Sequence, residues 1–170
     1  MKVMKVLLII AILAASSVFM DATAFAENYS YNIADGSISI SNGTGVNEGK
    51  IGVSQGAIRY IASSDSITIT GTTTANAINV APGVQGVNIV LDNVSIDVSG
   101  ISTTDPRYSI CAFDIGDGAE VDLTLSGETT NTFRSGIGKA GIRVEKPVSG
   151  TAATLTIQGL GTLHAIGGSG

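Results

Sequence analysis

Ile67-Thr68-Ile69-Thr70-Gly71 is one of four short blocks that decide the fold of this chain. Each block has apolar residues at alternate positions and ends in Gly or Asn. The other three blocks are Ile89-Val90-Leu91-Asp92-Asn93, Leu123-Thr124-Leu125-Ser126-Gly127 and Leu155-Thr156-Ile157-Gln158-Gly159. Successive side chains of a strand point to opposite sides, so the alternating Ile and Leu residues can share one interior. The residues predicted to face outward at equivalent positions are Thr68, Val90, Thr124 and Thr156.

A second kind of block lies before three of these strands at a similar offset. Its members are Ala77-Ile78-Asn79-Val80, Ala112-Phe113-Asp114-Ile115 and Gly141-Ile142-Arg143-Val144. A further strand is expected after two of the first blocks, at 93–98 and 161–166. The first blocks are spaced by about 22, 34 and 32 residues, which is typical of solenoids, propellers and arrays. A propeller blade needs four strands, whereas three short strands per unit predict an all-β, right-handed parallel β-helix.

The composition fits a stack of such β-coils. Each coil would bury its apolar side only against its neighbours, so inward Ile, Val and Leu residues would form continuous columns. Gly accounts for 22 of the 170 residues and suits the corners, because it tolerates the positive backbone angles of tight turns. The chain has no Trp and 5% aromatic residues, which is typical of a narrow aliphatic interior.

Three regions are expected along the chain. Residues 1–26 contain Lys2 and Lys5, then an apolar run and Ala24-Phe25-Ala26, the order of a secretory signal peptide, which predicts a secreted or cell-surface protein. The apolar run is shorter than the roughly 20 residues of a membrane span, so no membrane insertion is expected after signal removal. Residues 27–65 are expected to form an N-terminal cap or first irregular coil, and residues 66–170 the β-helix repeats.

Two segments are expected to depart from the regular stack. The polar stretch 99–108 contains Pro106 and is predicted to leave the stack as a loop. The chain ends in Ile166-Gly167-Gly168-Ser169-Gly170, without a distinct capping segment. An open last coil would expose hydrogen-bonding edges and apolar surface. We therefore expect either a fragment truncated at the C-terminus or a short chain whose last edge pairs with another molecule.

Charge and residue inventory argue against several function classes. Without residues 1–26 the chain has seven Lys and Arg against thirteen Asp and Glu, with no basic run, so nucleic acid is not an expected partner. Cys111 is the only cysteine and lies in an apolar stretch, so we expect a buried small hydrophobic residue rather than a nucleophile. His164 is the only histidine, expected on a strand surface, and neither a Ser-His-Asp triad nor a zinc site is indicated. We expect no catalytic activity.

Three stretches resemble a known family. They are Ala77 to Ser99, Cys111 to Gly136 and Ala140 to Leu163, together over half of the chain after the signal peptide. These stretches are similar to the exported β-helix repeats of bacterial surface proteins described as carbohydrate-binding domains. The resemblance implies a fold like that of polysaccharide lyases and binding of acidic plant polysaccharide such as polygalacturonate, in some members with calcium and without known cleavage.

Calcium binding and lyase chemistry are kept as a minor alternative. Ca²⁺ takes oxygen ligands, and lyases of uronate polymers use an Arg or Lys as the base beside a calcium-bound carboxylate. The candidate metal ligands are Asp114, Asp117 and Asp122, with Asp92 and Glu120 as further oxygen donors. The candidate bases or carboxylate clamps are Arg107, Arg134, Lys139 and Arg143. The acidic residues do not have EF-hand spacing, so a solvated turn is the competing interpretation.

Carbohydrate binding without reaction is the favoured hypothesis. Outward side chains on stacked strands repeat at about 4.8 Å and can contact an extended polymer through many weak hydrogen bonds. The candidate ligand-binding residues are Asp92, Arg134, Arg143 and Gln158, with Ser126 beside them. The tyrosines, Tyr29, Tyr31, Tyr60 and Tyr108, lie mostly outside the repeats, which favours ionic or calcium-bridged contacts over sugar stacking. A solvated scaffold, a cell-surface adhesin or structural spacer, and an ice-binding threonine array are the alternatives.

Overall fold

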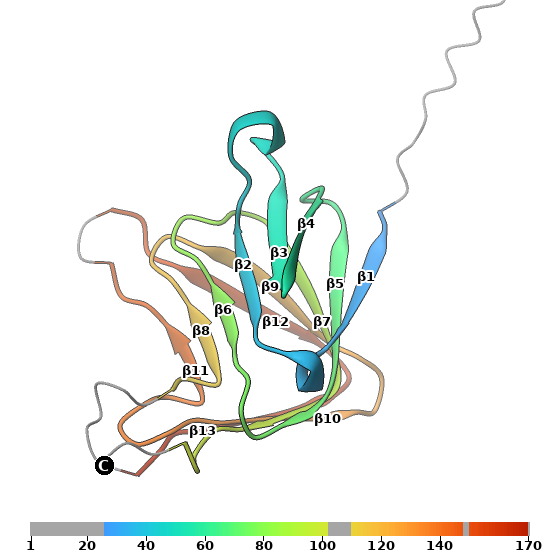
Figure 1. The fold of residues 1–170 in the computed structure, drawn as a ribbon. Helices are drawn as coiled ribbons and strands as arrows, with labels where there is room; N and C mark the ends of the chain where they lie inside the picture. Colours follow the sequence, from blue (N-terminus) through green and yellow to red (C-terminus); the bar gives the residue numbers. More distant parts are fainter. Residues whose placement is uncertain (1–25, 102–109, 148–149, 170) are drawn as a thin grey trace, which may run out of the picture.

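The computed structural model describes residues 26–101, 110–147 and 150–169. The fold is all-β, with two sheets of mainly parallel strands (Figure 1). The predicted signal peptide, apart from Ala26, and the loop residues Arg107 and Tyr108 lie outside the described residues. Within the described ranges, no helix is long and apolar enough to cross a membrane.

The seven-stranded sheet has the order β1-β5-β7-β10-β13, and β9 pairs with both β7 and β12. Its strands are β1 (Asn28–Asn32), β5 (Ser66–Thr73), β7 (Val87–Asp97), β9 (Glu120–Leu125), β10 (Thr130–Arg134), β12 (Thr154–Gly159) and β13 (Thr162–Ile166). The six-stranded sheet has the order β11-β8-β6-β2-β3-β4. Its strands are β2 (Ile38–Asn42), β3 (Ile51–Gln55), β4 (Ala57–Ile61), β6 (Ile78–Val80), β8 (Phe113–Ile115) and β11 (Ile142–Val144).

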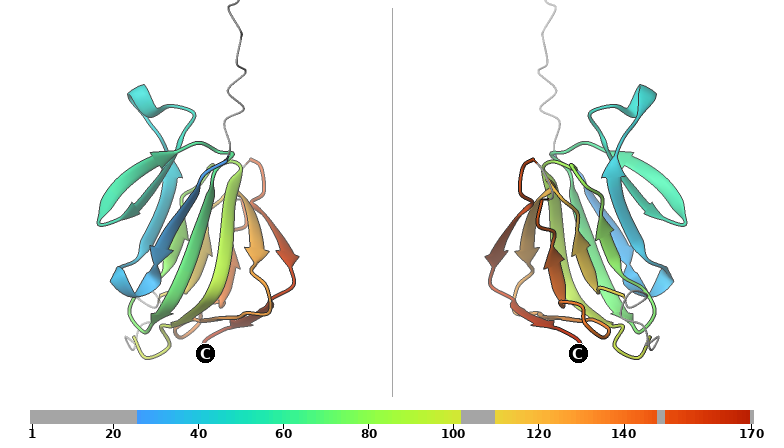
Figure 2. Two further views of the ribbon diagram at one scale, coloured as in Figure 1. Left: turned by 90° about the vertical axis from the view of Figure 1, so that its right-hand side faces the viewer. Right: turned by 90° about the vertical axis from the view of Figure 1, so that its left-hand side faces the viewer.

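The chain alternates between the two sheets and adds each new strand beside an earlier one. From β5 onward it passes to β6 in the six-stranded sheet, returns to β7, and passes again to β8. The pairs β1 with β5, β5 with β7, β7 with β9 and β9 with β12 are all parallel. Figure 2 shows this stepwise addition of strands: the colours progress from blue on one side of the molecule to red on the other.

The first three repeated blocks are in the register that the sequence predicted. Ile67 pairs with Ile89, and Ile89 pairs with Leu123, and all three side chains are buried. Ile69, Leu91 and Leu125 form the next buried column in the same way. The alternation of apolar and polar residues therefore places these aliphatic side chains on one side of the sheet, as expected for period-two strands.

The predicted register of the last block was wrong by two residues. Ile157 pairs with Leu123 rather than Leu125, so Gln158 and not Thr156 lies beside Thr124. The physical cause is the length of the corner that follows. Residues 126–129 connect β9 to β10, whereas residues 160–161 connect β12 to β13, and the later strands are again in register. A shift by two residues keeps the same side chains inward, because two is the period of a strand.

The second blocks form the matching strands of the six-stranded sheet. Phe113 on β8 pairs with Ile78 on β6 on one side and with Ile142 on β11 on the other. The sequence correctly predicted these strands and also the further strands at 93–98 and 161–166, which are the second half of β7 and β13. The strand β10 was not predicted. Phe113 and Phe133 are fully buried, and their ring centroids lie 5.5 Å apart. Both sheets therefore contribute to one hydrophobic core.

The Gly and Asn residues that end the four first blocks all have positive φ angles. The values are 92° for Gly71, 58° for Asn93, 46° for Gly127 and 105° for Gly159. L-residues with a Cβ are strained in this region, and Gly and Asn tolerate it best. The expectation that Gly supplies positive backbone angles is confirmed at three of these positions, although Gly71 and Asn93 lie within β5 and β7 rather than between strands.

The segment 27–65 contributes both regular strands and a hairpin. β1 and β2 pair in parallel with β5 and β6, so Tyr29 and Tyr31 continue the columns of Ile67 and Ile69. The strands β3 and β4 then extend the six-stranded sheet in the antiparallel direction. The expectation that the tyrosines lie mostly outside the repeats is therefore wrong for Tyr29 and Tyr31, which are in register with Ile67 and Ile69.

At the opposite end of both sheets the inward positions are less covered. Ile157 is 48% exposed although its neighbour Leu123 is fully buried, because no described strand lies on the other side of β12. Val144 on the edge strand β11 is 41% exposed. The prediction that the Ile and Leu of the last block would be buried in the interior is therefore wrong for Ile157.

Candidate functional site

The outward side chains of the seven-stranded sheet form a surface that we name the polar face. It consists of residues from β1, β5, β7, β9 and β12. These residues are Asn28, Ser30, Asn32, Ser66, Thr68, Thr70, Asn88, Val90, Asp92, Glu120, Asp122, Thr124, Thr154, Thr156 and Gln158. Val90 is the only apolar member. Hydroxyl, amide and carboxylate groups therefore cover a surface that extends across five adjacent strands.

The register arranges the polar face in rows that cross the strands. The central row is Ser30, Thr68, Val90, Thr124 and Gln158. A second row is Asn28, Ser66, Asn88, Asp122 and Thr156. Adjacent strands are about 4.8 Å apart, so each row offers hydrogen-bonding groups at that repeat.

Hydrogen bonds within a row, between the rows and to a nearby backbone carbonyl hold several of these side chains in place. The Thr68 hydroxyl donates to Asn28 Oδ1 at 2.8 Å, and Gln158 Nε2 donates to Thr124 Oγ1 at 3.2 Å. Asn88 Nδ2 donates to the carbonyl of Ser63 at 2.8 Å. Side chains fixed in this way lose less conformational entropy when a ligand binds.

The four predicted ligand-binding residues do not lie together. Asp92 and Gln158 belong to the polar face, but in different rows. Arg134 on β10 lies beyond the corner and is 3.8 Å from Asp97 Oδ2. Arg143 is on the six-stranded sheet, so it is not beside Asp92 or Gln158 as the hypothesis required.

Arg143 is instead engaged by one of the predicted metal ligands. Its Nε donates to Asp114 Oδ1 at 2.6 Å and its Nη2 donates to Asp114 Oδ2. This bidentate contact raises the pKa of Arg143, chiefly through the hydrogen bonds to Asp114. Asp114 therefore has both carboxylate oxygens occupied by a guanidinium.

The predicted calcium ligands also lie on different elements. Asp114 is on β8 of the six-stranded sheet, Asp122 is on β9 of the seven-stranded sheet, and Asp117 is in the turn between them. No group of three His, Cys, Asp or Glu side chains in the described ranges is placed to hold a metal ion. With Asp114 already paired to Arg143, the three residues fit calcium poorly, and no chemistry is assigned to this ion.

Cys111 and His164 have the environments that the sequence predicted. Cys111 is a buried free thiol whose sulfur lies 3.1 Å from the carbonyl oxygen of Ala140. Burial raises the pKa of this thiol. His164 is exposed on β13 and pairs with Thr132.

Two cavities lined by described residues are candidates for a ligand site. The larger, of about 470 Å³, is lined by Gly83, Gln85, Asp117, Gly118 and Thr151. Asp117 Oδ1 is buried there and has no hydrogen-bond partner among the described residues. None of the described residues that line this cavity is cationic, so they offer little to a negatively charged ligand.

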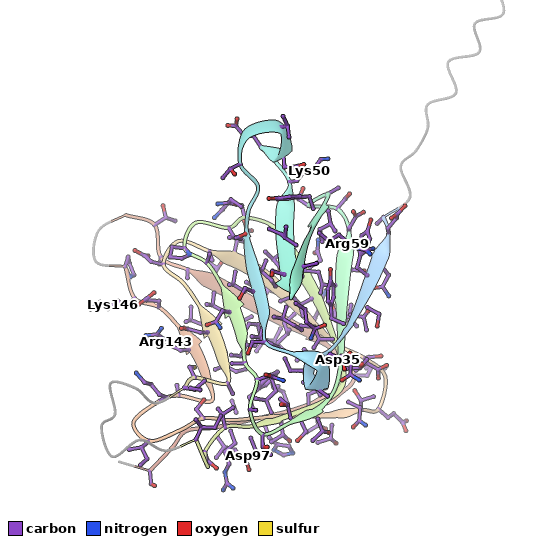
Figure 3. The ribbon with its side chains drawn as sticks, in the orientation of Figure 1. Asp35, Lys50, Arg59, Asp97, Arg143 and Lys146 are labelled. Atoms are coloured by element: carbon purple, nitrogen blue, oxygen red, sulfur yellow. The ribbon has the colours of Figure 1, made fainter. Side chains whose placement is uncertain are left out.

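The smaller cavity, of about 190 Å³, lies where β4 meets the edge strand β1. It is lined by Asn28, Tyr29, Ser30, Tyr31 and Arg59. Figure 3 shows Arg59 at this edge and Arg143 far from it. Sequence analysis missed this group, because the β3–β4 hairpin brings Arg59 to residues 28 positions or more earlier in the chain. The alternation of Tyr29 and Tyr31 in a strand-like stretch was the available signal.

Comparisons with protein-family models, with curated proteins and with solved structures found no match to this chain. The candidate functions therefore depend on the geometry of the polar face and of the small cavity.

Proposed function

We propose that this protein is an exported, non-catalytic module that binds polysaccharide along the polar face. The observation that carries the proposal is the row Ser30, Thr68, Val90, Thr124 and Gln158, in which four of the five side chains are polar. An extended polymer with many hydroxyl groups can form a series of such contacts, each weak, whose sum gives useful affinity.

The proposal also includes how the two sheets are organised into coils. We infer a right-handed parallel β-helix, in which the seven-stranded sheet supplies two strands of each coil and the six-stranded sheet supplies the third. The parallel register and the positive φ angles at Gly71, Asn93, Gly127 and Gly159 support this arrangement. A stack of this kind keeps outward rows straight over several coils, which suits a linear ligand.

Acidic polysaccharide, such as polygalacturonate, is the proposed ligand class. The polar face itself contains three carboxylates, Asp92, Glu120 and Asp122, and no Lys or Arg. Its contacts with the polymer are therefore contacts to hydroxyl groups. Recognition of the polymer's carboxylates requires a cation outside the polar face, and Arg59 lies next to Asn28 and Ser30 in the small cavity.

Affinity electrophoresis tests the proposal with polygalacturonate in one gel and neutral galactan in another. Wild-type protein is expected to be retarded by polygalacturonate. Thr124→Glu places a negative charge in the centre of the polar face and is expected to abolish retardation, while Ser39→Glu places the same charge on the exposed side of β2 and is the matched control. Equal migration of wild type with and without polymer would remove the proposed function. Retardation by galactan alone would support a polysaccharide-binding module and contradict its specificity for acidic polysaccharide.

A structural spacer or adhesin is the second candidate function. It is favoured by the incomplete burial of Ile157 and Val144 on the edge strands β12 and β11, where a further layer of strands can pair. Sedimentation equilibrium tests it, since a spacer that joins other copies by this end will associate as its concentration rises. Ile157→Asp is expected to reduce that association. A monomer at all concentrations would contradict this use of the end.

A further inference from the structure

Arg59 stacks on Tyr29 and forms no ion pair with any described carboxylate. Its guanidinium carbon lies 5.2 Å from the centroid of the Tyr29 ring. The ion pairs within the described ranges involve Arg134 and Arg143, and Arg59 is in none of them. An arginine stacked on an aromatic face keeps its N–H groups available for a planar acceptor such as a carboxylate.

Tyr31 also lines this cavity. Its hydroxyl oxygen is buried and has no hydrogen-bond partner among the described residues. A buried polar group without a partner is costly in the unliganded protein, so a ligand oxygen that accepts a hydrogen bond from this hydroxyl is bound favourably. Burial raises the pKa of Tyr31, which keeps the hydroxyl protonated at neutral pH. The Tyr29 hydroxyl, by contrast, already donates to Glu27 and leaves only its ring for a ligand.

The cavity has the size and position for one unit of a polymer. Its volume of about 190 Å³ equals the space of about six water molecules at ~30 Å³ each, enough for a carboxylate and the adjoining part of a ring. Asn28 and Ser30 belong both to its lining and to the polar face. A polymer that follows the central row toward β1 therefore reaches Arg59 after Ser30.

We propose that this cavity binds the carboxylate of a uronate sugar, with Arg59 as its cationic partner, Tyr31 as a hydroxyl donor and the Tyr29 ring as a wall. The inference rests on the proposed function, because it assigns the acidic specificity of the polysaccharide to this one place. Under this proposal the cavity determines the specificity for acidic sugars, and the polar face supplies the repeated contacts with the polymer.

Isothermal titration with digalacturonate, galactose and acetate tests the pocket separately from the polymer. Digalacturonate is expected to bind wild type more tightly than acetate does, and galactose to show no binding. Arg59→Gln is expected to weaken digalacturonate binding by about tenfold or more, as the loss of a charge-assisted hydrogen bond predicts. Lys50→Gln removes one positive charge from the same hairpin region (Figure 3) and is expected to bind like wild type. Tyr31→Phe is expected to weaken binding while the urea midpoint of the free protein stays equal or rises.

The outcomes separate this inference from the proposed function. Thr124→Glu is expected to lose retardation by polygalacturonate and to keep binding digalacturonate, because the cavity is untouched. If wild type is retarded by polygalacturonate and Arg59→Gln is retarded equally, the pocket assignment is overturned and the binding module stands. If digalacturonate binds in an Arg59-dependent way but no polymer is retarded, the pocket stands and the proposed function fails. Equal affinity for acetate and digalacturonate would overturn the assignment to a sugar.

Discussion

The side-chain oxygen of Asn131 accepts a hydrogen bond from the backbone N–H of Val94 at 2.9 Å, and both residues are fully buried. Val94 follows the corner at Asn93, where the backbone turns through a positive φ angle. The Asn131 amide nitrogen also lies 3.4 Å from the carbonyl oxygen of Thr162 on β13. One inward amide on β10 thus links the strand before it and the strand after it in the seven-stranded sheet.

Asn131→Leu is expected to destabilise the protein by about 1–3 kcal/mol, because the Val94 N–H is left buried without an acceptor. Urea unfolding followed by circular dichroism measures the change. Thr130→Ala, at an exposed position on the same strand, is expected to change the free energy of unfolding by less than about 0.5 kcal/mol. Equal effects of the two substitutions would contradict the role given to Asn131.

Gly159→Ala is expected to destabilise more than Gly127→Ala. Both residues have positive φ angles, so both substitutions carry the cost of roughly 1–2 kcal/mol for a Cβ in this region. A Cβ at Gly159 would also lie 2.2 Å from the carbonyl oxygen of Leu125, whereas a Cβ at Gly127 meets no atom within 4 Å. Thermal unfolding of the two variants should therefore give a clearly lower midpoint for Gly159→Ala. The reverse order would refute the close packing of β12 against β9.

Cys111 is expected to react slowly with iodoacetamide at pH 8 in the folded protein. Burial raises the pKa of its thiol, so the fraction of reactive thiolate at this pH is lower than for an exposed cysteine. The residue is also only 8% exposed, which limits access of the reagent. Mass spectrometry over time should show labelling at least about tenfold faster in urea. Equal rates in buffer and in urea would show that the thiol is accessible in the native state.

The pair Arg143 and Asp114 is expected to contribute little to stability. Their side chains are 42% and 20% exposed, and partly exposed ion pairs contribute about 0–1 kcal/mol. A double-mutant cycle with Arg143→Gln and Asp114→Asn measures the coupling energy. A coupling well above that range would indicate that the bidentate contact is shielded from solvent more than its exposure implies. Neither variant is expected to alter retardation by polygalacturonate, because the pair lies on the six-stranded sheet.

The sequence predicted strands and inward residues well because both follow from local alternation. Ile67, Ile89 and Leu123 could be aligned from their positions relative to the Gly and Asn residues that end their blocks. The same rule failed at Ile157, because it assumed that all corners have the same length. The corner before β13 is two residues shorter than the corner before β10, and register depends on that length as well as on pattern.

The candidate site was less predictable, because it depends on which residues meet across long separations. Arg143 and Asp92 carry suitable groups, but alternation cannot tell that they occupy different sheets. Arg59 reaches Tyr29 only because β4 belongs to the antiparallel β3–β4 hairpin, which departs from the repeat. Irregular segments of this kind have no period from which a position can be inferred.

Titration of ¹⁵N-labelled protein with oligogalacturonate tests polysaccharide binding along the polar face. The largest changes in chemical shift are expected at backbone amides of the central row, especially Thr68, Val90 and Thr124, and at Arg59. Amides of β6 and β8 in the six-stranded sheet are predicted to change little. Changes concentrated on β6 and β8, or no changes at millimolar ligand, would contradict polysaccharide binding along the polar face.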